Sequence, residues 1–148
     1  DTLAGGPGAD TLFGGWGDDV VGAVEDAADP ETDYLNGGGG DDLIIAGVND
    51  IVTAGDGADT VALGDWLTQD HQAEILDFEV GQDNLMIVYD DQSGAEPDLT
   101  LEDDETDADR HHVVMNGERI ASVVGAPGLT LDDLVLVGQS ALDSLTAA

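Results

Sequence analysis

The chain has almost no basic residues, no cysteine and few aromatic residues. Its 148 residues contain 2 Lys plus Arg against 34 Asp plus Glu, which gives a formal net charge of −32. A surface this negative repels nucleic acid and anionic membranes, so we expect neither as a partner. Without cysteine the chain cannot form a disulfide framework, and life outside the cell would require another means of stabilisation.

Long apolar runs are also missing. No stretch approaches the length of a membrane-spanning helix, and the first residues do not have the pattern of a signal peptide. Because the chain starts at Asp1 rather than at a methionine, we expect it to be the C-terminal part of a larger protein.

The charge and the shortage of aromatic residues both oppose folding. Aromatic residues make up only 4% of the chain, and chains with high net charge and few aromatics stay disordered unless something offsets the charge. A ligand present at ten times its dissociation constant stabilises a fold by about 1.4 kcal/mol per site. Several such sites would together match the whole stability of an ordinary domain, about 5–15 kcal/mol. We therefore expect bound cations to decide whether the first half of the chain folds.

What the sequence does contain is a nine-residue repeat of glycine, aspartate and an apolar residue. It begins with a glycine run, has aspartate at its sixth place and an apolar residue at its eighth, as in residues 14–21, 37–44 and 54–61. The sixth-place residues are Asp10, Asp19, Asp33, Asp42, Asp50 and Asp59. A register held over about the first sixty residues indicates a repeat architecture rather than an acidic linker.

Each residue type in the repeat has a physical reason. Glycine allows a positive φ, which turns backbone carbonyls toward a common point, and calcium binds about six to eight oxygen atoms from carbonyls and carboxylates. The apolar residue faces inward from a very short strand. Since nine residues form half a coil, each loop stacks on the loop two repeats away, and a cation can lie between them.

This pattern resembles the RTX (repeats-in-toxin) family of calcium-binding β-rolls. The resemblance implies an all-β fold in which a parallel β-roll is followed by a small antiparallel β capping unit, with roughly five calcium ions in the roll. It implies that the six aspartates are metal ligands. The glycines that would direct carbonyls to the metal are Gly6, Gly8, Gly15, Gly17, Gly38, Gly40, Gly55 and Gly57.

Two copies of the repeat depart from the pattern. Residues 25–31 add about five positions before Asp33, and we expect them to bulge out as a loop. The copy that ends at Asp50 lacks most of its glycines, which makes any site using Asp50 the weakest. Loops should alternate between the two edges of the roll, with Asp1, Asp19, Asp42 and Asp59 along one edge and Asp10, Asp33 and Asp50 along the other.

After residue 66 the glycine period ends. Residues 73–85 suggest two short strands joined by a turn, and this segment is similar to the one that follows the roll in serralysin-type proteases and related RTX proteins. Residues 99–101 form a further strand, residues 113–124 form a hairpin around the Asn116-Gly117 turn, and residues 134–137 form a closing strand after a cap at Thr130. We therefore divide the chain into a roll (1–66), an antiparallel cap (67–138) and a tail (139–148). The resemblance implies that the tail includes part of an export signal.

The sequence offers little catalytic chemistry. His111 and His112 are neighbours on a predicted strand and should face opposite sides, each exposed and ion-paired. We expect Trp16 and Trp66 to be packed under the cap or under the inserted loop rather than to form a platform that stacks on sugars. No serine belongs to a Ser-His-Asp pattern, so we expect a module that is not an enzyme.

The leading interpretation is a calcium-binding module of a secreted bacterial protein. The resemblance implies export by a type I secretion apparatus, with folding outside the cell where calcium is abundant, and we expect a monomer. An alternative of a different class is a calcium-dependent polysaccharide-binding accessory module of a secreted enzyme such as an epimerase.

Overall fold

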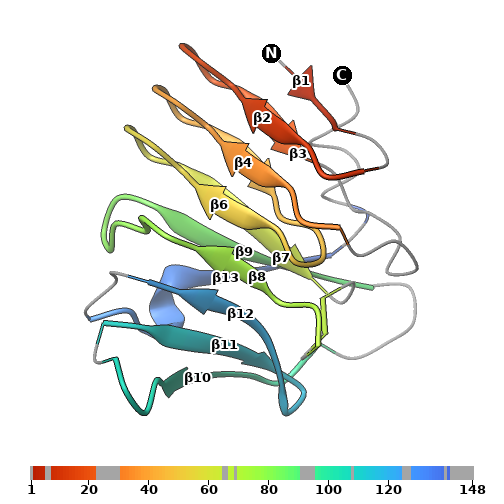
Figure 1. Cartoon of the computed structure of the whole chain (residues 1–148). Helices are drawn as coiled ribbons and strands as arrows, with labels where there is room; N and C mark the ends of the chain where they lie inside the picture. The colour runs from red at the N-terminus through yellow and green to blue at the C-terminus, as the bar shows by residue number, and fades with distance from the viewer. Residues whose placement is uncertain are drawn as a thin grey trace.

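The structure is a computed structural model that describes residues 2–5, 8–22, 31–64, 67–68, 70–90, 96–107, 109–124, 128–138 and 140. Within these residues the chain forms thirteen strands and one short 3-10 turn, arranged as two sheets that enclose a common core (Figure 1). No helix within the described residues is long and apolar enough to cross a membrane. Gly6, Trp66 and most of the inserted loop and of the tail lie outside the described residues.

One sheet has six strands, all parallel, in the order β1-β3-β5-β7-β9-β13. Its strands are β1 (Thr2–Leu3), β3 (Val20–Gly22), β5 (Leu43–Ile45), β7 (Thr60–Gly64), β9 (Asn84–Tyr89) and β13 (Leu134–Gly138).

The other sheet has seven strands in the order β10-β11-β12-β8-β6-β4-β2. Its strands are β2 (Thr11–Phe13), β4 (Tyr34–Asn36), β6 (Ile51–Thr53), β8 (Ala73–Ile75), β10 (Leu99–Asp103), β11 (His111–Met115) and β12 (Glu118–Val123). Consecutive strands up to β9 alternate between the two sheets, so each pair of strands completes one coil of a roll.

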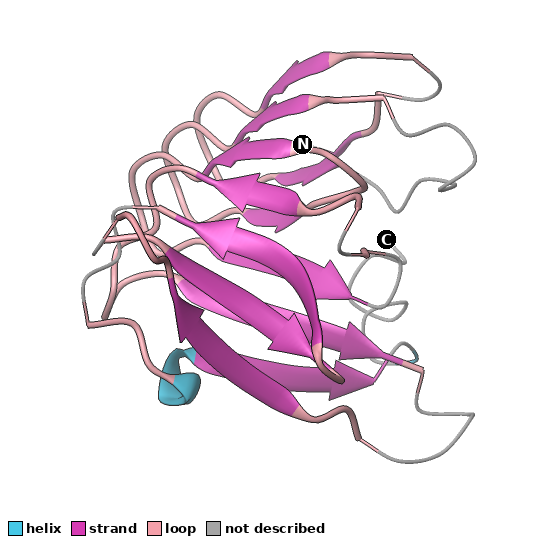
Figure 2. Ribbon diagram, turned by 60° about the horizontal axis from the view of Figure 1, so that its bottom comes forward, coloured by secondary structure: helices cyan, strands magenta, loops and turns pink. Residues whose placement is uncertain are grey.

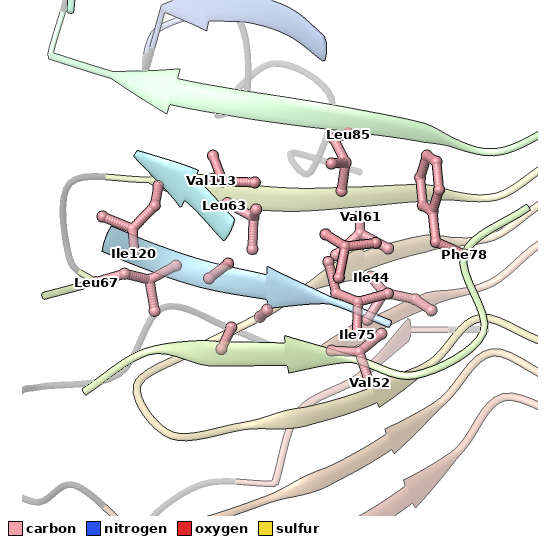
Figure 3. Packing of buried hydrophobic residues seen from close by; sticks show 14 of the residues in the cluster. Ile44, Val52, Val61, Leu63, Leu67, Ile75, Phe78, Leu85, Val113 and Ile120 are labelled. Atoms are coloured by element: carbon pink, nitrogen blue, oxygen red, sulfur yellow. The ribbon is translucent and has the colours of Figure 1, made fainter. Parts of the chain in front are cut away.

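The core follows from the eighth-place residue of the repeat. The middle residue of each three-residue strand from β2 to β6 points between the sheets, and parallel register places these core residues directly above one another, as in Val21, Ile44 and, from β7, Val61. Figure 3 shows how Val52 and Ile75 from the opposite sheet pack against this row. Very short strands therefore suffice, because β3, β4, β5 and β6 each contribute a buried side chain to a continuous core.

The second half differs from the expected antiparallel cap in how its strands pair. Strand β8 pairs in parallel with β6, β9 pairs in parallel with β7, and β13 adds to β9 in parallel. Only β10, β11 and β12 form an antiparallel meander. Residues 73–85 do contain two strands, but these lie in different sheets and form one more coil of the roll. The division of the chain at residue 66 stays a prediction.

The local turn signals of the second half are confirmed. Asn116 and Gly117 both have positive φ, 55° and 82°, and they join β11 to β12. The 3-10 turn η1 (Leu131–Asp133) begins with a capping box, in which the backbone N–H of Thr130 donates to Oδ2 of Asp133 at 2.9 Å.

Candidate metal sites

The sixth-place aspartates form two ladders, one along each edge of the roll. On the first edge, the backbone N–H of Asp19 donates to Oδ1 of Asp42 at 2.8 Å, and the N–H of Asp42 donates to Oδ1 of Asp59 at 2.8 Å. On the second edge, the corresponding bonds run from Asp10 to Asp33 at 2.7 Å and from Asp33 to Asp50 at 3.1 Å. The six sixth-place aspartates are thus sorted between the edges as the sequence predicts, while Asp1, which was expected on the first edge, lies outside the described residues.

The loops of the first edge, residues 14–19, 37–42 and 54–59, stack directly on one another (Figure 2). The backbone N–H of Gly39 donates to the carbonyl of Gly15 at 2.8 Å, and the N–H of Asp56 donates to the carbonyl of Gly38 at 2.9 Å. Each loop is therefore held to the next by backbone hydrogen bonds as well as by the aspartate side chains.

The second carboxylate oxygen is the unusual feature of these ladders. Oδ2 of Asp10, Oδ2 of Asp42 and Oδ2 of Asp59 are buried and receive no hydrogen bond in the described part of the chain. Asp42 and Asp59 are 3% and 0% exposed. Burial, together with the neighbouring carboxylates, raises the pKa of Asp59 to about 7 and also raises the pKa of Asp42. A buried carboxylate oxygen without a donor requires a proton or a cation.

The glycines allow neighbouring loops to approach one another closely. Gly38 has a φ of 92°, and a Cβ atom there would collide with the carbonyl oxygen of Gly15 in the preceding loop. A Cβ atom at Gly40 would likewise meet the carbonyl oxygen of Gly17. The predicted glycines with positive φ are Gly8, Gly15, Gly17, Gly38, Gly40, Gly55 and Gly57. Only glycine permits both the turn and this close approach of two loops.

This set of donors suits calcium better than a transition metal. Among the described residues, no three His, Cys, Asp or Glu side chains converge to hold a metal ion. A cation between two loops would therefore bind backbone carbonyls and one or two carboxylates, an all-oxygen set that calcium accepts. The orphaned Oδ2 atoms and the glycine carbonyls fit such an ion.

Asp50 differs from the other aspartates. Its Oδ1 accepts the N–H of Asp33, and its Oδ2 accepts the N–H of Gly47 at 2.7 Å, so backbone donors already use both oxygens. The preceding residue, Asn49, has a φ of 63° and contacts His71 through side-chain nitrogens 3.3 Å apart. The loop before Asp50 is a compact turn and not a glycine-rich loop like residues 37–42. This difference is consistent with the predicted weakness of a metal site at Asp50.

Replacing Asp42 by alanine should raise the calcium concentration at the folding midpoint more than replacing Asp50 by alanine. Asp42 contributes an orphaned oxygen between two intact loops, whereas the oxygens of Asp50 only close a turn. We expect about a tenfold shift or more for Asp42→Ala, since one lost charged ligand corresponds to about 1.4 kcal/mol or more. Calcium titrations followed by circular dichroism measure both midpoints, and equal shifts would contradict this ranking.

Two aspartates that the sequence analysis did not single out as site residues continue the first edge. Asp83 precedes β9 as Asp59 precedes β7, and its Oδ1 accepts the N–H of Asp59 at 3.0 Å. Asp77 accepts the N–H groups of Ala54 and Gly55 at 2.7 and 2.9 Å. An aspartate directly before a strand, as at Asp83, could have identified this position from the sequence. The loop before Asp83, however, lacks the glycine pattern of the repeat.

The histidines and Trp16 differ from the sequence expectation. His111 and His112 are each 8% exposed rather than on the surface. Each is paired as predicted, with Nδ1 of His111 3.0 Å from Asp103 and Nε2 of His112 2.9 Å from Asp104. Hydrogen bonds from the backbone of Thr106 and from His112 hold the pKa of Asp104 below its usual range. Trp16 is 93% exposed, so it is not packed under another segment.

Comparison with known proteins agrees with this geometry. Residues 1–23, 28–48 and 49–65 match the family model of the RTX calcium-binding nonapeptide repeat, in four copies. Among solved structures, the fold is similar to the solution structure of the AlgE6R3 subunit from the Azotobacter vinelandii mannuronan C5-epimerase. The TM-score is 0.58 at 22% sequence identity, over 88% of this chain and 80% of that one. No curated protein matches the sequence.

Proposed function

Since its first half carries RTX calcium-binding nonapeptide repeats, we propose that this chain is a non-catalytic module that folds when calcium binds and stabilises a larger secreted protein. The observation that carries the proposal is the set of buried Oδ2 atoms, on Asp42 and Asp59 of the first edge and on Asp10 of the second, each without a hydrogen-bond donor in the described residues. Calcium supplies the positive charge that these oxygens require. The ladder of Oδ1 atoms holds successive loops in register, and the glycine carbonyls complete the oxygen shell.

The proposal accounts for the extreme acidity of the chain. With 34 acidic and 2 basic residues, the unligated chain repels itself, which favours an expanded state where calcium is scarce. Extracellular calcium modules bind their ions at about 10⁻⁴ to 10⁻³ M. A chain of this kind would leave the cell unfolded, through a type I secretion apparatus, and would fold outside. The aspartates of both ladders are its proposed ligands.

Isothermal titration calorimetry with calcium and with magnesium tests this function. We expect saturable calcium binding in the range of about 10⁻⁴ to 10⁻³ M and much weaker binding of magnesium, which demands a tight octahedral shell and keeps its waters. Asp103→Asn, at an exposed carboxylate outside the roll, is a matched control that should leave the isotherm unchanged. Equal binding of the two metals, or no saturable calcium binding, would contradict the proposal.

A second candidate function is calcium-dependent binding of a polysaccharide. Exposed aromatic side chains favour it, because Phe13 and Tyr34 lie on the outer face of the seven-stranded sheet and Trp16 follows in the adjacent loop. Such rings can stack on sugars. Both arginines are ion-paired, Arg110 with Glu74 and Arg119 with Glu102, so an acidic polymer could be held only through bridging calcium. A glycan array probed with and without calcium, and with Trp16→Ala, distinguishes this function from a purely structural one.

A further inference from the structure

Resting on the proposed calcium binding, we propose that residues 76–83 end the calcium stack of the first edge without a metal. This loop joins β8 to β9 and lies directly beyond loop 54–59, where a further glycine loop would continue the roll. Asp77 accepts hydrogen bonds from backbone N–H groups of loop 54–59, and Gln82 donates one to the carbonyl of Gly57, the oxygen that would otherwise face the next cation.

The carboxylate of Asp77 accepts hydrogen bonds from the backbone N–H groups at the start of loop 54–59. In the coil above, the N–H of Gly37 donates to a backbone carbonyl, that of Thr53, at 3.1 Å. At the equivalent place one coil on, the N–H groups of Ala54 and Gly55 both donate to the carboxylate of Asp77. Both oxygens of Asp77 therefore face N–H donors, and a carboxylate satisfied in this way does not require a cation.

The side chain of Gln82 donates a hydrogen bond to a backbone carbonyl further along the same loop. The carbonyl oxygens of Gly17 and Gly40 lie close against the following loops, and neither receives a hydrogen bond from the described residues. The carbonyl of Gly57 is different, because Nε2 of Gln82 donates to it at 2.6 Å. The amide N–H thus supplies to this oxygen the positive partner that a cation supplies in the coils above.

Asp83 continues the ladder, and both of its carboxylate oxygens already accept hydrogen bonds. Its Oδ1 accepts the N–H of Asp59 and its Oδ2 accepts the N–H of Glu79, both at 3.0 Å, so it closes a turn within its own loop. The cations of the first edge therefore lie between loops 14–19 and 37–42 and between loops 37–42 and 54–59, and none lies beyond loop 54–59.

Native mass spectrometry at saturating calcium tests this assignment by counting bound ions. We expect Asp77→Asn and Gln82→Ala to keep the ion count of the unaltered chain, while the calcium midpoint for folding rises by about threefold to tenfold because hydrogen bonds are lost. Asp42→Asn, the matched control inside the stack, should lose at least one ion.

The outcomes separate this inference from the function on which it rests. If the unaltered chain binds no calcium, the proposed function is wrong. If the unaltered chain binds calcium but Asp77→Asn or Gln82→Ala binds one ion fewer, the loop is itself a metal site and the inference is overturned. Should Asp77→Asn fail to fold, Gln82→Ala decides alone, since Gln82 is exposed and contributes nothing to the core.

Discussion

Removing calcium with EGTA should unfold the roll, with loss of most of the β-sheet signal in circular dichroism. The buried carboxylates of Asp42 and Asp59 would then have neither a cation nor a donor for Oδ2, and the coils would carry their full negative charge. If several ions each contribute about 1.4 kcal/mol or more, their loss removes a free energy comparable to the whole stability of a small domain.

Two controls accompany this experiment. Adding calcium back should restore the signal, which shows that the loss is reversible, and magnesium at the same concentration should not. Sodium chloride at high concentration screens the general repulsion between acidic residues without filling the sites. A sheet signal that persists in EGTA, or that salt alone restores, would show that the ladders do not need calcium.

Truncating the chain after Leu67 should prevent folding even at millimolar calcium. Strand β8 covers the edge of β6 and strand β9 covers the edge of β7, so the truncated roll would expose both edges and its core. Figure 3 shows Ile75, Phe78 and Leu85 packed against the row of roll residues. Each of these side chains contributes about 1.5–3 kcal/mol when buried, which the short coils cannot replace.

The matched control is a chain that ends at residue 138 and lacks only the tail. We expect it to fold at nearly the same calcium concentration as the full chain. Circular dichroism and calorimetry on residues 1–67 and 1–138 give both midpoints. A 1–67 fragment that folds at the calcium concentration of the full chain would refute the capping role of the second half.

Much of the roll could be predicted from the repeat, because each repeat position has one physical task. Glycine at Gly38 and Gly40 permits the contact between loops, Asp42 begins the ladder bond, and Ile44 fills the core. The sorting of the aspartates between two edges follows from the alternation of half-coils. These features depend on local conformation and on the stacking of neighbouring coils. The spacing of glycine, aspartate and apolar residues in the repeat determines both.

The continuation of the roll beyond residue 66 could not be predicted from the glycine period. Strands β8 and β9 keep the short, inward-facing apolar pattern, but Asp77 and Gln82 replace glycine as the partners of the loop above. Side chains that reach over more than twenty residues leave no local periodicity in the sequence. For the same reason Asp77 was not predicted as part of the site, and Asp83 was missed because the loop before it lacks the glycine pattern.

The burial of the histidines depends on tertiary packing that alternation alone does not determine. His111 and His112 were correctly assigned to a strand, yet both faces of β11 are covered, so both side chains are buried. Trp16 shows the reverse case, because a large aromatic residue was expected to be covered and its ring stays exposed over Gly39. Sequence patterns predict the face of a strand more reliably than what lies against that face.

The ladder of bonds from each aspartate N–H to the next Oδ1 also determines how the ions should bind relative to one another. An ion that fixes the carboxylate of Asp42 also fixes the backbone of Asp19, and an ion at Asp59 fixes the backbone of Asp42. Occupancy of one site thereby lowers the conformational entropy that the neighbouring site still has to lose. Binding along the edge should then follow nearest-neighbour cooperativity in one dimension. The fraction of occupied sites would then rise steeply over a narrow range of calcium concentration, with a Hill coefficient above one. Independent sites would instead fill gradually.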